Sequence, residues 1–384
     1  MDASGAHRVI QNRRALYSFL QTQMVADEER ADEKYQTGVL KSFVFEVDNF
    51  PAGASRRKKA AHIRNLFTYH TKRTRLTFKA EVLEEEGFYM VTVRGKKKKA
   101  ELWVDTSTNP RFWLAYSLSE AKNLDTWLRN VATQSKNFDF IWLWPLFLEA
   151  IQARGMPRGF GLDYDYTKFA HRESEVTRYL KMQIWGGIKT TELYSSLKQT
   201  FGHEIILSRV RMKETNSGID NFAMQSLGYS GKFNVRGTDF SVHNATLNHV
   251  RSRYEAEIKR IESCSLSWVE RENGGHVLEG YALHFIPQDI LLDLDAFYPH
   301  VFGGVKPFRL AGLPISRTNT SIITDVVDMH AGGLLRFELY PDLISVYLRA
   351  GTCGNSIARL YTNLQHYFGA RFKVVSDNGI VFFE

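Results

Sequence analysis

Apolar and polar residues follow two periods along this chain, one typical of helices and one typical of strands. Apolar residues recur at about 3.6 positions within 7–36, which predicts a helix, and partly alternate with polar residues over 39–47, which predicts a strand. Ser55 is a residue type that caps helix N-termini, so a second helix is expected from there to about residue 69. Three alternating segments within 76–104 then predict an antiparallel meander, with four consecutive lysines at one hairpin tip.

The residue pattern in the middle of the chain predicts a boundary between two domains. A strand is expected over 112–116 and an aromatic-rich helix over 138–152, in which Pro145 is a kink or a boundary. The stretch 154–166 contains three glycines and a proline, which is typical of a loop. We therefore expect an N-terminal α+β domain over 1–155, containing the meander, and a C-terminal α+β domain over 156–384.

The second half contains an internal similarity. Residues 194–202 are similar to residues 361–369 when the two segments are aligned position by position. Each segment lies within a predicted pattern of strand, glycine turn, helix, glycine and strand. The pattern indicates a possible duplication over about 180–215 and 342–377. The overall fold class predicted is α+β, with antiparallel or mixed sheets, packed helices and possible ferredoxin-like β-α-β modules in the second half.

Bulk properties limit the class of protein. The chain of 384 residues is 43% hydrophobic, which is typical of a globular chain with a substantial core. It has only two cysteines, Cys264 and Cys353, which favours a reducing compartment. Two cysteines also argue against a disulfide scaffold and against a structural zinc site. The start lacks the pattern of a signal peptide, and the most apolar stretch, 138–148, is too short to span a membrane. We expect a cytoplasmic protein without membrane contact.

Charge is distributed very unevenly. Residues 51–100 carry fourteen Lys or Arg against four Asp or Glu, whereas residues 101–384 carry thirty of each sign and residues 1–50 have a net charge of −2. The net charge of +8 therefore arises from one segment of the chain. A concentration of this kind predicts a surface that binds an anionic partner.

The basic segment places its cations in three clusters. The first occupies the opening turn of the predicted helix, where positive charge opposes the helix dipole and a bound anion would relieve the conflict. The third lies at the exposed hairpin tip, from which ammonium groups can reach a phosphate backbone. Candidate nucleic-acid-binding residues are Arg56, Arg57, Lys58, Lys59, Lys72, Arg73, Arg75, Arg94, Lys96, Lys97, Lys98 and Lys99.

Two glycine turns are candidate phosphate sites, because each leads from a predicted strand into a helix N-terminus. Neither matches the mononucleotide or the dinucleotide glycine motif, so no nucleotide cofactor is predicted. The alternative interpretation is that the glycines only turn the chain. The residues concerned are Gly187 and Lys189 in the first copy and Arg349, Gly351 and Gly354 in the second.

Carboxylates offer two candidate catalytic groups, although no catalytic motif is present. Asp163 and Asp165 alternate on a predicted loop and resemble a pair that holds a magnesium ion, but aspartates beside glycines also form turns. Asp325, Asp328 and His330 follow a β-branched run, at a strand end where active sites are often built and where polar edges are also common. We assign no catalytic residue and no metal site from these patterns.

The sequence resembles no family that we recognise. The hypothesis it favours is a non-catalytic nucleic-acid-binding protein, a subunit or adaptor of a larger complex, whose segment 51–100 contacts phosphates largely without reading sequence. The sequence leaves open DNA or RNA. Two alternatives are a metal-dependent, nuclease-like enzyme and a protein-interaction module that binds an acidic partner.

Overall fold

The structure, a computed structural model, has the predicted α+β class, with antiparallel sheets packed against helices. It describes residues 10–29, 40–68, 77–95, 99–165, 179–187, 189–201, 205–216, 221–272, 274–288, 290–368 and 371–384. The chain divides into two compact units, and each is assembled from separate stretches of sequence. The first unit comprises Met1–Ile141, Ile151–Arg158 and Arg211–Ser252, and the second comprises Trp142–Ala150, Gly159–Val210 and Arg253–Glu384.

The domain boundary expected at residue 155 lies close to one crossing between the units, at Arg158 and Gly159. The other crossings carry no glycine-rich or proline-rich linker, so composition gives no sign of them. Two of them lie inside helices and another lies inside a strand. The units are therefore interleaved in sequence.

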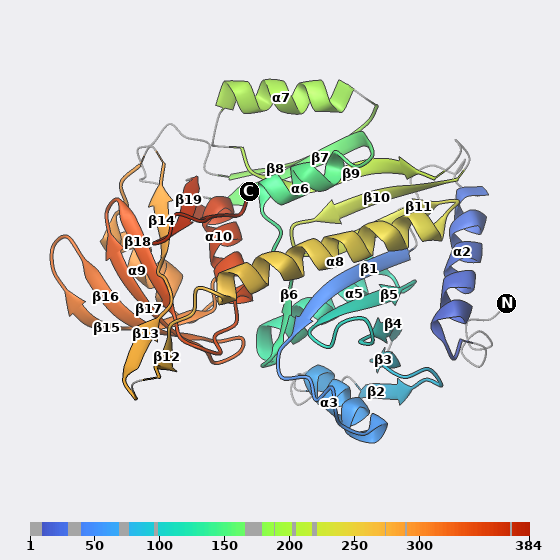
Figure 1. The fold of residues 1–384 in the computed structure, drawn as a ribbon. Helices are drawn as coiled ribbons and strands as arrows, with labels where there is room; N and C mark the ends of the chain where they lie inside the picture. Colours follow the sequence, from blue (N-terminus) through green and yellow to red (C-terminus); the bar gives the residue numbers. More distant parts are fainter. Residues whose placement is uncertain are drawn as a thin grey trace. The chain divides into compact units, whose positions relative to one another are not determined.

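The first unit contains the N-terminal elements and a hairpin contributed by residues beyond 220 (Figure 1). Its complete elements are α2 (Arg13–Glu29), β1 (Leu40–Val47), α3 (Arg56–Thr68), β2 (Thr77–Val82), β3 (Phe88–Arg94), β4 (Lys99–Asp105), β5 (Phe112–Ser117), α5 (Ala121–Gln134), β6 (Phe138–Phe140), β10 (Phe222–Gly228) and β11 (Lys232–Gly237). Four elements have residues in both units: α6 (Pro145–Gln152), β7 (Met156–Asp165), β9 (Leu207–Thr215) and α8 (Phe240–Glu262).

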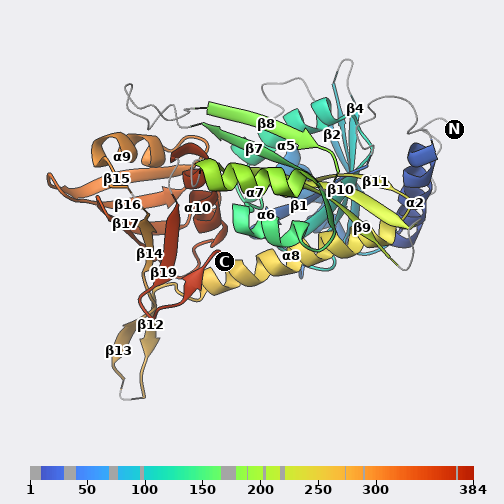
Figure 2. The same cartoon turned by 90° about the horizontal axis from the view of Figure 1, so that it is seen from above.

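The sheet of the first unit buries its two faces against different helices. Its strand order is β2-β3-β4-β5-β1-β11-β10-β9, and the same sheet continues through β7 to β8 (Tyr179–Trp185). Phe43 and Phe45 of β1 pack with α3 and α5 residues in one aromatic core. Ser42, on the opposite face of β1, contacts His243 of α8. Figure 2 accordingly shows α5 and α8 on opposite sides of β1 and β11.

The second unit contains a seven-stranded antiparallel sheet of order β15-β16-β17-β18-β14-β19-β20 and a separate hairpin, β12–β13. Helices α9 and α10 pack against one face of this sheet, where Phe297 contacts Phe368 and Phe302 contacts Phe337. Its elements are α7 (Lys189–Phe201), β12 (Ser267–Glu270), β13 (His276–Glu279), β14 (Leu283–Pro287), α9 (Leu294–Phe302), β15 (Leu310–Arg317), β16 (Ile322–Asp328), β17 (Leu334–Tyr340), β18 (Leu343–Leu348), α10 (Asn355–Phe368), β19 (Phe372–Ser376) and β20 (Val381–Phe382).

One local prediction is wrong in part and another is wrong. The helix expected over 138–152 begins only at Pro145, which confirms Pro145 as a boundary, and the residues before it contain β6. The stretch 154–166 is not a loop, because residues 156–165 form β7. Its glycines have a packing role instead. A Cβ atom on Gly159 would lie 2.3 Å from the ring of Trp185, so only glycine allows this close approach.

Both copies of the internal similarity fold as strand, helix and strand. The units are β8–α7–β9 and β18–α10–β19, and in each case one other strand, β7 or β14, lies between the two strands of the copy. Burial differs between them, since α10 is almost entirely buried whereas α7 is largely exposed. A ferredoxin-like module is not established by this arrangement, and the duplication stays a prediction. No helix in the described ranges is both long and apolar enough to cross a bilayer.

Candidate nucleic-acid interface

The first basic cluster opens α3, as the sequence predicts. Arg56 is the first residue of the helix, and the Ser55 hydroxyl accepts a long hydrogen bond of 3.4 Å from the backbone amide of Lys58. No acidic residue lies in the first turn. The helix therefore begins with four cations at the end where its dipole favours anions.

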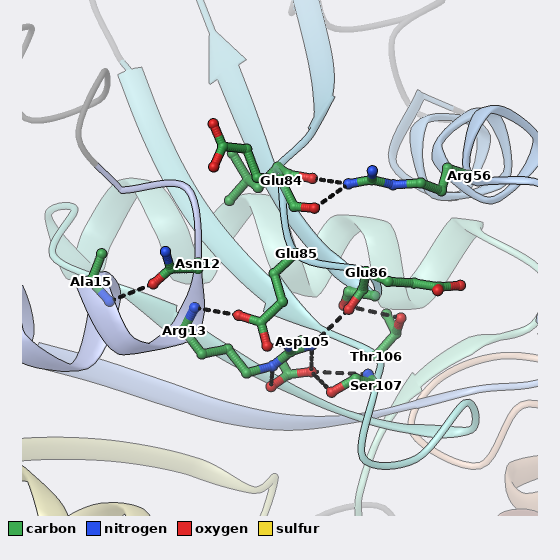
Figure 3. Close-up of polar contacts among 12 residues, drawn as sticks. Asn12, Arg13, Ala15, Arg56, Glu84, Glu85, Glu86, Asp105, Thr106 and Ser107 are labelled. Carbon is green, nitrogen blue, oxygen red and sulfur yellow. Dashed lines mark hydrogen bonds and ion pairs between the residues drawn. The ribbon is translucent and has the colours of Figure 1, made fainter.

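Part of this conflict is resolved inside the molecule by an acidic loop, residues 83–86, which follows β2 (Figure 3). The Arg56 guanidinium donates hydrogen bonds to the carbonyl oxygens of Leu83 and Glu84. The Lys59 ammonium, which is 8% exposed, lies 3.0 Å from the carboxylate of Glu86. Two of the four cations at the start of α3 therefore have protein partners.

The acidic loop is fixed on its other side by α2 (Figure 3). The backbone amide of Arg13 donates to the Glu85 carboxylate at 2.7 Å, and the Arg13 side chain pairs with both Glu85 and Asp105. The distance from Arg13 Nε to Asp105 Oδ2 is 2.6 Å, and Asp105 is buried. Each glutamate of the loop thus has a separate contact: Glu84 through its carbonyl, Glu85 with α2, and Glu86 with Lys59.

The remaining cations of the first cluster face solvent. Arg57 and Lys58 are exposed, and neither side chain forms a hydrogen bond or ion pair with the residues that the structure describes. An open cleft of about 660 Å³ lies beside them, between α3 and β2. Arg56, Arg57 and Arg64 line this cleft together with small residues of α3 and with Glu84. Arg57 and Arg64 are seven residues apart and so lie on one face of the helix.

The third cluster lies where expected, at the end of the β3–β4 hairpin. Arg94 and Lys99 are paired in register, which places the lysine-rich segment at the connection between these strands. Lys99 forms an ion pair with Glu101. Six predicted contacts lie outside the described residues: Lys72, Arg73, Arg75, Lys96, Lys97 and Lys98.

The described clusters lie along one strand. The acidic loop and the start of α3 adjoin the C-terminal end of β2, through the bond from Arg56 to Leu83. Arg94 is paired with Thr77 at the opposite end of β2. Five strand steps separate Thr77 from Val82, a length of about 17 Å. The helix start and the hairpin base therefore lie at opposite ends of β2. Arg94 and Lys99 point to the sheet face away from α3, because their neighbours Val93 and Ala100 pack in the core with α3.

The predicted phosphate turns differ in what their backbone atoms bind. In the first, the Gly187 carbonyl accepts hydrogen bonds from the amide and hydroxyl of Thr190, and Lys189 is exposed. In the second, the amide of Gly354 donates to the Glu262 carboxylate at 2.8 Å. A phosphate at Gly354 would have to displace this carboxylate.

Arg349 and Gly351 of the second turn are exposed and have different backbone roles. Arg349 is bridged to Leu266, and its carbonyl accepts a hydrogen bond from the amide of Thr352. Gly351 has a φ of 80°, a conformation that favours glycine. A turn-forming role therefore accounts for this glycine.

The structure does not bring the predicted carboxylates into one site. Asp325 faces outward from β16 and pairs with Arg336 at 2.9 Å, whereas Asp328 faces the core and pairs with Arg359. Asp163 and Asp165 share one face of β7, where Asp163 lies 3.5 Å from the Lys181 ammonium. His330, next to Asp328, is fully buried.

Asp328 and Arg359 form an ion pair with no solvent exposure. Burial alone would raise the pKa of Asp328, but the positive charge of Arg359 and a hydrogen bond from Ser356 hold that pKa well below its ordinary value. Arg359 also donates to the carbonyl oxygen of Phe308 at 2.8 Å. These contacts indicate a role in the core.

One arrangement of catalytic residue types is not visible in the sequence. Ser345 Oγ lies 2.9 Å from His284 Nδ1, and His284 Nε2 lies 2.6 Å from Asp377 Oδ1. Ser345 is only 4% exposed, whereas the Asp377 side chain is half exposed. Ser345 also lies in a central strand, whose amides are used by the sheet and cannot bind an oxyanion. The hydroxyl is therefore a poor nucleophile for an external substrate.

Comparison with known proteins matches the chain along nearly its whole length. A family model described as "MJECL33-like protein" matches residues 5–381. A protein of Methanocaldococcus jannaschii, named "Uncharacterized protein MJECL33", is 22% identical over 404 residues. That alignment covers 94% of this chain and 92% of the relative.

Proposed function

This chain belongs to the MJECL33-like family, and we propose that it is a non-catalytic nucleic-acid-binding protein that contacts phosphates through its first unit. The family description specifies no ligand or reaction, so the proposal rests on residues of this chain. The observation that carries it is the cleft beside α3, in which Arg56, Arg57 and Arg64 meet. Arg57 and Lys58 add two exposed cations at the same helix start.

Binding at this surface is largely independent of base sequence. The two exposed cations lie on the outside of a helix that packs on β2, a position suited to a phosphate backbone. Cations that neutralise phosphates release condensed counterions, and this release gives affinity without base contacts. Arg94 and Lys99 at the hairpin base supply further cations near the opposite end of β2, on the sheet face away from α3.

The form of the nuclease-like alternative that uses Asp325 and Asp328 gains no support from the geometry. Asp325 and Asp328 point to opposite faces of β16, and each pairs with an arginine. A magnesium ion requires carboxylates that share one site and are free to bind it. The alternative of an acidic protein partner uses the same cations, and the experiment below separates it from nucleic acid.

We place the protein in the cytoplasm, as a subunit or adaptor of a larger complex with other proteins. Cys264 and Cys353 are both free and buried, which suits a reducing compartment. Sequence-independent binding by itself selects no target, so protein partners would supply the selection.

The test is fluorescence anisotropy with labelled DNA and RNA over a range of salt concentrations. We expect binding that survives chelator and weakens steeply with salt. Arg57→Gln combined with Lys58→Gln should weaken it several-fold, whereas a matched pair in the second unit, Lys259→Gln with Arg271→Gln, should not. The absence of any binding at low salt would overturn the proposal. An acidic peptide that binds when nucleic acid does not would favour the protein-partner alternative.

A further inference from the structure

A second cationic surface lies on the sheet of the first unit, away from α3. Side chains alternate between the two faces of β9, β10 and β11. On one face, Gln225 contacts His243 of α8 at 2.8 Å, and Glu214 accepts a hydrogen bond from Thr246 of the same helix. The opposite face therefore carries the neighbours of these residues. In the first unit they are Arg211, Lys213, Phe222, Met224, Ser226, Lys232, Asn234 and Arg236, all partly exposed, and we call them the open sheet face.

The open sheet face has four cations and no acidic residue. Asp125 of α5 pairs with Lys232 at 2.5 Å, which marks the edge of the region that α5 covers. The other three cations, Arg211, Lys213 and Arg236, lie beyond this edge. Their charge is concentrated on one side of the sheet, whereas the α8 side holds the buried acid Glu214.

One of these cations, Arg236, is close enough to Arg211 to disfavour the positive charge of Arg211. Burial lowers the pKa of Arg211, and the neighbouring charge of Arg236 lowers it further. Arg236 Nε is buried and has no hydrogen-bond partner among the described residues. A buried guanidinium nitrogen beside a like charge is costly, and an anion placed between the two arginines would relieve both costs.

The third cation is held above the sheet by an aromatic ring. The Lys213 ammonium lies 4.0 Å from the centre of the Phe222 ring, a cation–π contact that keeps it over the open sheet face. Arg211 and Lys213 are two strand steps apart, about 7 Å, and Arg236 is paired in register with Met224 of the intervening strand. The three cations therefore lie on β9 and β11, with β10 between these strands.

We propose that the open sheet face binds single-stranded nucleic acid, with Arg211, Lys213 and Arg236 on successive phosphates. This inference rests on the proposed function and adds a second surface and a preferred form of ligand to it. Charge complementarity carries the assignment, because three cations on a sheet face to which these strands contribute no acidic residue fit a polyanion. A single strand is favoured over a duplex because antiparallel sheet faces of this kind accept splayed, unpaired strands.

The experiment compares two double variants with the unaltered protein. Arg211→Gln with Arg236→Gln should weaken binding to a single-stranded oligonucleotide of about 16 nucleotides roughly tenfold, and should make the slope of log affinity against log salt shallower by about 1.4. This change in slope is expected because the variant loses two phosphate contacts, and each contact to a single strand contributes about 0.7 to the slope. Lys259→Gln with Arg271→Gln removes the same charge from the second unit and should change neither quantity.

Each alternative outcome has a separate meaning. If the α3 variant, Arg57→Gln with Lys58→Gln, weakens binding but the sheet variant does not, this inference is overturned and the proposed function stands. If the unaltered protein binds no nucleic acid, the proposed function itself fails. A duplex of the same sequence that binds as tightly as the single strand overturns the preference for single strands.

A second measurement does not depend on how well the variants fold. The unaltered protein is photo-crosslinked to an oligonucleotide containing 5-iodouracil, and the attached peptides are identified by mass spectrometry. Crosslinks are expected within residues 211–236. Crosslinks confined to α3 and the β3–β4 hairpin would contradict a contact at the open sheet face.

Discussion

The ammonium group of Lys59 lies 3.0 Å from the carboxylate of Glu86, and this contact joins the start of α3 to the acidic loop. The hydrogen bond from Lys59 lowers the pKa of Glu86, which keeps the carboxylate ionised. A cluster of four cations that looks uniform in sequence therefore has two kinds of member. Arg56 and Lys59 hold the helix to the loop, whereas Arg57 and Lys58 remain available to a ligand.

Neutralising Glu84 should strengthen nucleic-acid binding. Its carboxylate is exposed beside the three arginines of the cleft, and Arg56 uses only its backbone carbonyl. Glu84→Gln keeps that carbonyl and removes a charge that repels phosphates, so affinity should rise about twofold to threefold. Anisotropy measures the change, and Glu279→Gln, an exposed position in the second unit, is the matched control. Unchanged affinity would place the ligand outside the cleft.

Replacing Lys96, Lys97, Lys98 and Lys99 with alanine should weaken nucleic-acid binding at least several-fold. The paired residues Arg94 and Lys99 define the hairpin, so the replaced segment lies at a connection between strands. The unfolding transition should move little, because Lys99, the described residue of the four, forms only a partly exposed ion pair with Glu101. Anisotropy and thermal denaturation are measured on the same sample. Unaltered affinity would mean that the hairpin lysines are only a solvated connection.

Asp328→Asn should destabilise the second unit strongly. It leaves the fully buried Arg359 without its counter-ion, a change that typically costs about 3–5 kcal/mol. The control is Asp325→Asn, which breaks the half-exposed pair with Arg336 on the same strand and should cost less than about 1 kcal/mol. Urea denaturation measures both. Equal effects would contradict the assignment of Asp328 to the core.

The first unit should lose stability as the pH falls, because His243 is buried in its neutral form. Burial lowers its pKa from 6.5 to about 3, so between these values the unfolded chain binds a proton that the folded chain does not. Stability is therefore lost as the pH falls through this window, by at most about 1.4 kcal/mol per pH unit.

The test compares the unaltered protein with His243→Gln by urea denaturation at pH 7 and pH 5. The variant lacks the titrating group, so its stability deficit should narrow at the lower pH. His276→Gln, at an exposed hairpin position, should give a difference that does not change with pH. A deficit for His243→Gln that is constant with pH would show that His243 does not resist protonation.

The sequence predicted correctly those helices and strands whose formation depends on residues close together in the chain. The helix from Ser55 and the three-strand meander were confirmed, because periodicity and a hydroxyl cap are properties of neighbouring residues. Strand β7 was missed because Gly159 is required by the close approach of Trp185, a contact between residues 26 positions apart. No pattern within 154–166 contains that information.

The sequence predicted which cationic residues belong to the candidate site, but it did not predict which residues they contact. The concentration of charge over 51–100 located α3 and the hairpin, but the role of the acidic loop depends on Arg56 and Lys59, which lie across the fold. The open sheet face escaped detection for a related reason. Arg211 and Arg236 are 25 positions apart in the sequence, and only the sheet brings them to the same face within reach of each other's charge.

The interleaved units also constrain how this chain folds during synthesis. Leu40 of β1 is paired with Val235 of β11, so the N-terminal part of one edge of β1 has no native partner until almost two hundred further residues have been made; only the C-terminal part of that edge pairs earlier, with β6. Such distant pairing slows folding, and an unpaired strand edge is prone to associate with other chains. A ribosome-bound fragment ending before β10 should therefore be a target for chaperones. Expression of the first 155 residues alone should give an aggregating polypeptide and not a domain.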